Sequence, residues 1–490
     1  LRALLAEVPP ALPLRDAARA LAARLAARAA HARWLLFLVH GDGRAVAIAA
    51  WTPRPGTGAG TPRVHALVCA PHDVRDSDAE TLRALHAHAP PPNATAADAL
   101  LAHQHYVDVL GRERLGARFY HALAHTVGAL ADATTGVDDA HARADLALLC
   151  TTRCLFLAFL QAKGWLDGDH AFLAHRYDAC LAAGGDAHRR LLRPLFFGTL
   201  NTPRRRRAPA ARAFGRVPFL NGGLFAPTAL ERRHRAHHFG DDALGALLHD
   251  LLGRHRFTAR EDAASWSEAA VDPAMLGRAF ESLMHARDRR ATGAFYTPAP
   301  LVAQATDEAL RAALAAPRDG LPTLPPSLVD DALAGDAPAR AAHIRALHAR
   351  LAALRVLDPA CGSGAFLVHV LERVAALLAT AGDARSVSDR RRAVLTASIF
   401  GVDRNPTAVW LCELRLWLSC VIECDDDAQR LAPLPNLDHN VRVGDALAPP
   451  PGLPAVASLD AHDWGGAPWG GAGTRPRPAT TLADRRAWSR

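Results

Sequence analysis

The sequence is almost without lysine: Lys163 is the only one among 57 lysine and arginine residues. Its positive charge is therefore carried by arginine, with a formal net charge of +8 at pH 7. Part of this excess reflects a composition rich in alanine, arginine, glycine and proline. The charge permits a polyanionic partner but does not identify one.

The eight cysteines lack the dense spacing of a secreted disulfide scaffold, which indicates a reducing compartment and a cytoplasmic protein. Two pairs lie one helical turn apart, but neither forms the C-x2-C hook of common zinc sites, so no metal site is expected. The cysteines are Cys69, Cys150, Cys154, Cys180, Cys361, Cys412, Cys420 and Cys424.

Long apolar runs are also missing. The stretch from Trp34 to Val39 is far shorter than the roughly 20 residues that span a bilayer, and the stretch from Leu146 to Leu160 is interrupted by Arg153. We therefore expect no transmembrane segment and no membrane partner. With 490 residues, half of them hydrophobic, the chain is long enough for two to four domains with their own cores.

The first 104 residues predict a small α+β region. Leu1 to Arg33 has the apolar spacing of an amphipathic helix. Short apolar runs over 34–39, 45–51 and 63–69, separated by turn residues, then predict a small antiparallel sheet.

A mainly helical region is expected over 105–290, with interruptions at 201–212 and at the turn-like 221–223. Residues 317–338 are rich in proline, aspartate and alanine and predict a surface insertion. The tail over 448–490 is rich in glycine and proline and predicts irregular structure.

Alternating strands and helices are expected between 354 and 445, which predicts an α/β fold with a Rossmann-like, doubly wound parallel sheet. The carboxyl ends of its strands would bring Asp358, Asp403 and Asp445 to one edge of the sheet, where such folds bind ligands. The expected strands are 354–358, 398–403 and 440–445, and the expected helices are 365–379, 389–397 and 407–421.

The most informative motif is Asp358-Pro-Ala-Cys-Gly-Ser-Gly-Ala-Phe366, between the first of these strands and its helix. Gly362 and Gly364 allow the backbone to approach a ligand closely, although a tight turn alone would also use them. A dinucleotide fingerprint would need a third glycine where Leu367 stands, which disfavours a nicotinamide cofactor.

This motif resembles the cofactor-binding motif of adenine-N6 DNA methyltransferases of the type I and type IIG restriction-modification class. Other segments are similar to that family in the same order, so that the resemblance covers about 105–447. These segments are 156–165, 195–203, 218–225, 276–284, 293–298, 401–414 and 436–445.

The resemblance implies S-adenosylmethionine as cofactor and methylation of adenine N6 in double-stranded DNA, within a restriction-modification or phage-defence system. It also implies a partner such as a restriction nuclease or a specificity subunit, and an incomplete methyltransferase domain over 291–447. The cofactor-binding residues it implies are Tyr296, Thr297, Asp358, Ala360, Gly362, Gly364, Phe366, Asp403 and Asp445.

Each of these roles has an alternative. Asp403 is suited to accept both ribose hydroxyls, or it caps a helix. It lies 45 residues beyond Asp358, where about twenty is usual, and the extra helix explains the excess.

Asp445 would bind the cofactor's adenine amino group, or serve a turn, and Asp358 would face the methionine amino group. Tyr296 and Thr297 would contact the methionine carboxylate, or the aromatic side chain packs in the core.

Two basic clusters are candidate phosphate contacts, with a solvated surface run as the alternative for both. One is 204–207, and the other, with Arg287, Arg289 and Arg290, comes just before the segment 293–298.

The family's catalytic tetrapeptide, (Asn/Asp)-Pro-Pro-aromatic, is not found in the sequence, so no catalytic residue is assigned. We expect a fragment of a longer enzyme, inactive alone; the alternative is a non-catalytic DNA- or partner-binding scaffold. A methyltransferase acting on RNA or protein is a third reading, disfavoured by the long helical region. With Lys163 as the lone lysine, no Pro-Asp…(Asp/Glu)-x-Lys nuclease is expected.

Overall fold

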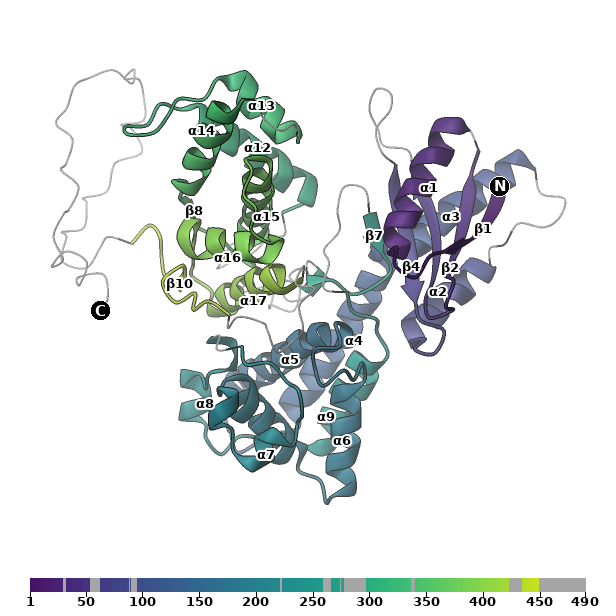
Figure 1. The fold of residues 1–490 in the computed structure, drawn as a ribbon. Coiled ribbons are helices and arrows are strands. Elements are labelled where there is room, and N and C mark those ends of the chain that lie inside the picture. Colours follow the sequence, from purple (N-terminus) through teal and green to yellow (C-terminus); the bar gives the residue numbers. More distant parts are fainter. Residues whose placement is uncertain are drawn as a thin grey trace, which may run out of the picture. The chain divides into compact units, whose positions relative to one another are not determined.

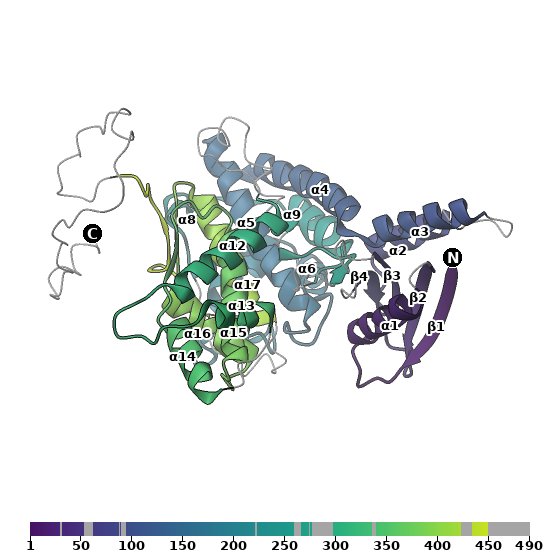
Figure 2. The same cartoon turned by 90° about the horizontal axis from the view of Figure 1, so that it is seen from above.

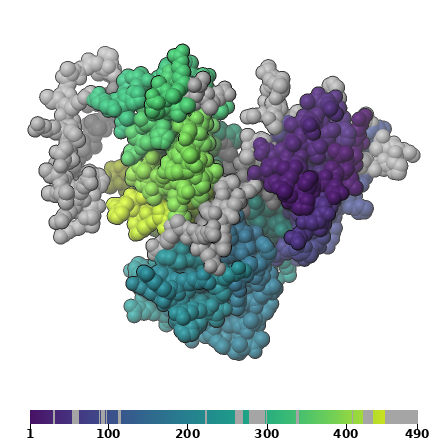
Figure 3. All heavy atoms as spheres, viewed as in Figure 1, coloured from purple at the N-terminus to yellow at the C-terminus, as the bar shows by residue number. Residues whose placement is uncertain are grey.

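The computed structural model describes residues 1–29, 32–52, 62–87, 89, 95–220, 223–258, 266–273, 275–276, 297–335, 340–422 and 434–448. The fold over these residues is mixed α/β and mostly helical (Figure 1). Residues Leu1–Ala446 form one compact unit, which contains all the helices and strands described here. By colour, the N-terminal segment is purple, the helical segment blue to teal and the later α/β segment green to yellow in Figure 3.

The N-terminal region is built on a five-stranded sheet with the order β1-β2-β3-β4-β7. β2, β3 and β4 pair antiparallel, whereas β1 pairs parallel to β2 and β7 pairs parallel to β4. Helix α1 covers one face of the sheet, and α2 and α3 contribute to the core on the other face (Figure 2). The elements are β1 (Arg2–Val8), α1 (Leu14–Arg28), β2 (Trp34–His40), β3 (Val46–Thr52), β4 (Arg63–Cys69), α2 (Asp76–Ala87), α3 (Ala96–Leu110) and β7 (Trp266–Glu268).

Two expectations for this region were wrong. The first residues do not extend the helix: β1 is a strand, and the helix begins only at Leu14, after the prolines at 9, 10 and 13. Proline lacks the N–H that a helix interior needs, which separates the two elements. The sheet is mixed, not antiparallel, because β1 and β7 add in parallel from distant parts of the chain.

The middle of the chain is helical, as the periodicity predicts. Its longest helix is α5, whose side chains are buried over most of its length. Three segments, η1, η2 and η5, have π-helical hydrogen bonding. The elements are α4 (Arg112–Asp132), β5 (Thr134–Thr135), α5 (Ala140–Ala162), α6 (Phe172–Ala182), η1 (His188–Leu192), η2 (Pro194–Leu200), η3 (Arg204–Arg206), α7 (Pro209–Arg212), η4 (Gly223–Phe225), α8 (Ala229–Arg233), β6 (His238–Phe239), α9 (Asp241–Gly245) and η5 (Ala246–Gly253).

Helix α5 is also the one described helix that is long and apolar enough to cross a membrane. Of the apolar 18-residue window of this helix, 78% is buried inside the protein. There α5 packs against α4, α6 and η5. Burial of this kind is typical of the central helix of a core.

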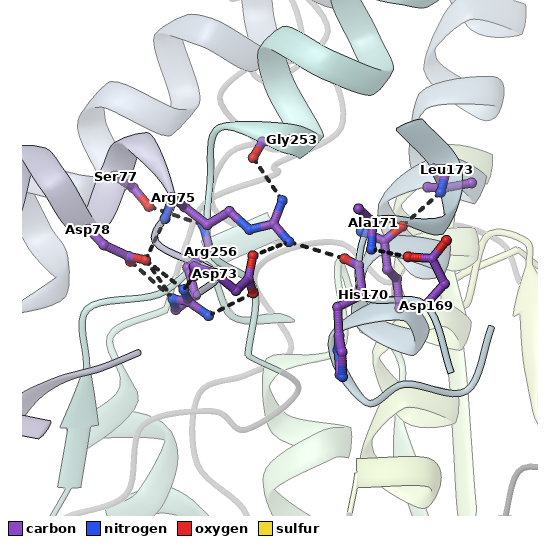
Figure 4. Close-up of polar contacts among 11 residues, drawn as sticks. Asp73, Arg75, Ser77, Asp78, Asp169, His170, Ala171, Leu173, Gly253 and Arg256 are labelled. Atoms are coloured by element: carbon purple, nitrogen blue, oxygen red, sulfur yellow. Dashed lines mark hydrogen bonds and ion pairs between the residues drawn. The ribbon is translucent and has the colours of Figure 1, made fainter. Parts of the chain in front are cut away.

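A polar cluster joins the loop before α2 to the segment that follows η5 (Figure 4). The Asp78 carboxylate is fully buried and accepts hydrogen bonds from Arg256, at 2.9 Å from Nε and 2.6 Å from Nη2. Arg75 donates to the carbonyl oxygens of Gly253 at 3.2 Å and His170 at 3.1 Å. A buried carboxylate needs such a partner, so this cluster holds the two segments together.

The later region contains a three-stranded parallel sheet with the order β10-β9-β8. From β8 to β10, the strands and helices match the predicted ones to within a few residues, whereas the helices before β8 were not predicted. The segment 317–338 was expected to be a surface insertion, but it includes α13, which buries Leu328, Val329 and Leu333. The elements are α12 (Ala299–Ala315), α13 (Pro326–Ala334), α14 (Ala341–Ala352), β8 (Val356–Asp358), α15 (Ala365–Thr380), α16 (Val387–Ser398), β9 (Ile399–Asp403), α17 (Pro406–Ile422) and β10 (Val441–Val443).

The two faces of this sheet differ. α15 packs on the face that carries Gly401, where an added Cβ would lie 2.7 Å from Leu367. On the opposite face, Leu357 is 62% exposed. The tail after 448 lies outside the described residues.

Candidate functional site

The carboxyl ends of β8, β9 and β10 lie at one edge of the parallel sheet. In the register, Asp358 lies opposite Gly401, and Val443 lies opposite Asp403. The chain beyond each strand therefore starts from the same edge, as the sequence predicts for the three carboxylates.

The loop between β8 and α15 is tied to the end of β9. The Cys361 N–H donates to the Val402 carbonyl oxygen at 2.9 Å, and the Gly362 N–H donates to Asp403 Oδ2 at 2.9 Å. At the start of the loop, the Ala360 N–H donates to Asp358 Oδ1 at 3.1 Å. The structure thus brings the glycine loop and Asp403 into direct contact.

The two glycines of the loop are needed for different reasons. Both have positive φ, +52° at Gly362 and +85° at Gly364, a region that other residues rarely adopt. A Cβ on Gly364 would lie 2.6 Å from Cys412 Sγ and 3.3 Å from its Cα, because α17 passes closely there. A Cβ on Gly362 would meet nothing within 4 Å, so the loop faces open space at this residue.

Asp403 does not cap helix α17. Its Oδ1 accepts a hydrogen bond from the Asn405 N–H at 2.8 Å, and Asn405 Oδ1 in turn accepts from the Ala408 N–H at 3.3 Å. The cap is therefore Asn405. Each oxygen of the Asp403 carboxylate has one backbone donor and keeps a further lone pair for a ligand.

Negative charge gathers at this edge. Burial raises the pKa of Asp358, and the nearby Asp403 raises it further. Asp445 is more exposed, with its Oδ2 at 3.7 Å from Arg404 Nε. The Gly444 N–H donates to the Asp403 carbonyl oxygen at 2.9 Å, which holds the end of β10 beside β9. The edge suits a ligand that presents N–H, O–H or positively charged groups.

The other predicted cofactor residues are only partly placed. Ala360 is exposed in the loop, and Phe366 is half-buried in the first turn of α15. Thr297 is half-buried just before α12, and no described hydrogen bond joins it to the loop. Tyr296 lies outside the described residues.

The two predicted phosphate-contact clusters have different outcomes. Arg287, Arg289 and Arg290 lie outside the described residues. The cluster 204–207 divides: its first three arginines are exposed, but Arg207 is buried and donates to the carbonyl oxygens of Thr202, Val217 and Pro218 at 2.9–3.1 Å. Phosphate contact by Arg207 was therefore a wrong prediction, because a guanidinium with these partners is part of the core.

Three residues that support the site were not singled out from the sequence. Arg415 is buried, and its Nη1 donates to the Ser363 carbonyl oxygen at 3.1 Å. Asn440 Nδ2 donates to the carbonyl oxygens of Leu395 at 3.1 Å and Ile399 at 2.9 Å, bracing the start of β9. Burial and the negative Asp438 raise the pKa of Glu413 to about 8. For Arg415 and Glu413 the sequence signal is a charged residue within an apolar stretch, whereas Asn440 has no such signal.

Cysteine and metal chemistry are not indicated at the site. Cys361 is buried, as is Cys412, and the contact between their side chains, with burial, raises the pKa of the Cys412 thiol. Cys361 therefore fits a small spacer. Among the described residues, no group of three or more His, Cys, Asp and Glu side chains is arranged to hold a metal ion.

The segment that contains the glycine loop is similar to known DNA methyltransferases. Residues 334–447 match the family described as MmeI, DNA-methyltransferase domain. A Methanocaldococcus jannaschii protein, named as a candidate type II restriction enzyme and methyltransferase, is 29% identical over 333 residues. The match covers 61% of this chain and 27% of that protein, so the chain spans about a quarter of this relative's length.

Two solved structures are also similar. One is the type IIL restriction-modification enzyme MmeI in complex with DNA, with 21% identity and a TM-score of 0.47, covering 68% of this chain and 40% of that one. The other is a DrdV–DNA complex, with 10% identity and a TM-score of 0.28, covering 90% and 33%. The match over 334–447 includes the glycine loop and all three carboxylates. Over these residues, the chain is therefore similar to a DNA-methyltransferase domain of the MmeI type.

Proposed function

We propose that the carboxyl edge of β8, β9 and β10 binds S-adenosylmethionine, and that the protein serves methylation of adenine N6 in DNA within a restriction-modification system. The observation that carries this proposal is the hydrogen bond from the Gly362 N–H to Asp403, which joins the glycine loop to the acidic end of the second strand. The sheet would be the first half of a Rossmann-like, doubly wound fold.

The open space at Gly362 supports the fit, because a ligand can approach the loop backbone there. Asp403 would accept the ribose hydroxyls with its remaining lone pairs, and Asp445 would accept a hydrogen bond from the adenine amino group. Asp358 would face the methionine ammonium, with Ala360, Gly364 and Phe366 shaping the loop and Tyr296 and Thr297 near the carboxylate. When bound, the cofactor supplies a methyl group activated by its sulfonium.

Double-stranded DNA is the proposed acceptor, and a nuclease or specificity subunit in the cytoplasm is the proposed partner. The 490 residues contain no (Asn/Asp)-Pro-Pro-aromatic tetrapeptide, which in this family orients the target base. This favours a second candidate function for the chain by itself: a scaffold that binds cofactor and DNA without transferring the methyl group.

Isothermal titration calorimetry with S-adenosylmethionine tests the cofactor site. Asp403→Ala removes the proposed ribose acceptor and should weaken binding by about 1.5–3 kcal/mol, or roughly ten- to a hundredfold. Asp319→Ala removes an exposed carboxylate of the same region and should leave affinity unchanged. Equal affinity of the parent and Asp403→Ala would refute the ribose role.

Transfer of a labelled methyl group to mixed-sequence duplex DNA tests the reaction. The 490-residue chain should show only background transfer, because its sequence has no (Asn/Asp)-Pro-Pro-aromatic tetrapeptide to hold the target adenine in line with the sulfonium. Its affinity for DNA should be weak and should fall steeply with salt. Robust adenine methylation by this chain would show that the catalytic group lies elsewhere in the sequence.

A further inference from the structure

The helical region contains a cavity of about 410 Å³ that is separate from the proposed cofactor site. It is open to solvent on one side and lined by α5, the π-helical segments η1 and η2, and the chain from 227 to 239. A volume of this size is within the usual range for small-molecule sites. Its lining residues are Leu146, Cys150, Arg153, His188, Arg193, Phe196, Phe197, Pro227, Glu231, Arg232, Arg235, His237 and Phe239.

The apolar part of this cavity is aromatic and rigidly built. Phe196 and Phe239 are buried, and the Arg153 guanidinium lies over the rings of Phe196 at 5.5 Å and Phe197 at 5.4 Å. Arg153 is fixed by Glu231, with Nη1 to Oε1 at 2.6 Å and Nη2 to Oε2 at 3.1 Å. Arg153 covers one face of Phe196 and of Phe197, and of the three lining phenylalanines Phe197 is the half-buried one, with surface left for a flat ring.

His188 gives the cavity a polar group that lacks a partner. Its side chain is buried, and Nδ1 makes no hydrogen bond within the described part of the chain. Burial, together with the neighbouring His237 and His238, lowers the pKa of His188 to about 3. The ring is therefore neutral at pH 7 and can hydrogen-bond to the edge of a heteroaromatic ligand.

Positive charge surrounds this aromatic part. Arg193, Arg232 and Arg235 line the cavity with exposed side chains, and Arg193 lies 5.8 Å from the centre of the Phe197 ring. Glu231 is the only acid in the lining, and its charge is neutralised by Arg153. Exposed guanidinium groups beside an aromatic surface fit a phosphate attached to a flat ring.

The backbone around the cavity is unusual as well. His188 starts η1, and Phe196 and Phe197 belong to η2, which begins at Pro194. π-helical turns are rare and are frequently found at functional sites. Here they turn the histidine and both phenylalanines into the lining of one cavity.

We propose that this cavity binds a nucleotide, with the base beside Phe197 and His188 and the phosphate against the exposed arginines. The nucleotide is either a free mononucleotide or one unit of a single strand, because both present the same base and phosphate. This site is separate from the glycine loop, and the proposal does not rest on S-adenosylmethionine binding there.

Calorimetry on the full chain, with adenosine monophosphate as probe and S-adenosylmethionine present in excess, tests the site. We expect binding that Arg193→Glu weakens by about tenfold or more. Arg205→Glu makes the same charge change on a nearby exposed residue outside the cavity and should have no effect. His188→Phe, checked for folding by its thermal midpoint, should also weaken binding.

A short single-stranded oligonucleotide separates the two sources of the nucleotide. Tighter binding of the oligonucleotide, with the same sensitivity to Arg193→Glu, assigns the cavity to a strand; tighter binding of the monophosphate assigns it to a free nucleotide. The proposal is overturned if neither probe binds, if Arg193→Glu and Arg205→Glu act equally, or if excess S-adenosylmethionine displaces the monophosphate.

Discussion

Replacement of Gly364 by alanine should destabilise the α/β region strongly. The residue has φ of +85°, and a left-handed conformation costs a residue with a Cβ about 1–2 kcal/mol. The new Cβ would lie 2.6 Å from Cys412 Sγ and 3.2 Å from its Cβ, and overpacking of this kind costs about 1–3 kcal/mol. Together the two effects amount to about 2–5 kcal/mol.

Gly362→Ala is the matched control. It has φ of +52° but no atom within 4 Å of the added Cβ, so only the backbone cost of about 1–2 kcal/mol applies. The two variants should therefore differ by about 1–3 kcal/mol, although the change is the same and the sites are two residues apart. If Gly362 faces the cofactor, its variant should lose cofactor affinity more than stability.

Urea unfolding and hydrogen exchange of α15 measure this difference on the full chain. α15 should lose protection in Gly364→Ala and keep most of it in Gly362→Ala. In a double-mutant cycle, Cys412→Ala should relieve part of the Gly364→Ala cost, with a coupling of about 1 kcal/mol. Equal destabilisation by the two glycine variants, with no coupling to Cys412, would refute the close approach of α17 as the reason for Gly364.

Three further changes test buried polar groups in the α/β region and in the helical region. The raised pKa of Glu413, about 8 against an ordinary 4.5, means that the folded state holds this proton more tightly than the unfolded state. Stability from this group should therefore be present below pH 4.5 and be lost as pH rises towards 8; Glu413→Gln should flatten that dependence in urea titrations at several pH values. Asn440→Ala removes the amide that donates to the Leu395 and Ile399 carbonyl oxygens and should cost about 1–3 kcal/mol in the same assay, whereas an unchanged midpoint would exclude the brace. Arg153→Met leaves the Glu231 carboxylate unpaired and should cost about 3–5 kcal/mol, while a loss below 1 kcal/mol would contradict a buried pair.

The α/β region could be predicted closely because its signals are local. β9 ends at Asp403 and α17 begins three residues later, at Pro406, where an apolar run starts. The contact between Gly362 and Asp403 follows from parallel strand order, which places successive carboxyl ends together. Sequence reasoning did not identify Asn405 as the cap, because Asp403 and Asn405 are both good cap residues two positions apart.

The remaining features depend on contacts between distant segments. β1 is a strand because Arg2–Val8 pairs with β2, and β7 joins β4 from about 200 residues away in the chain. The lining of the cavity in the helical region could not be predicted from α-helical periodicity. His188 and Phe196 belong to π-helical turns, whose residue spacing differs from that of an α-helix.

The charges of the two sites favour different ligands. At the sheet edge, burial and the nearby Asp403 raise the pKa of Asp358, and Arg404 is paired with Asp445. A ligand phosphate would add to this repulsion, whereas the ammonium and sulfonium of S-adenosylmethionine would relieve it. In the helical cavity, arginines outnumber the single acid, so a phosphate is favoured and a cationic ligand is not. Charge therefore disfavours binding of the nucleotide at the sheet edge and of S-adenosylmethionine in the helical cavity. Each calorimetric test accordingly reports on one site alone.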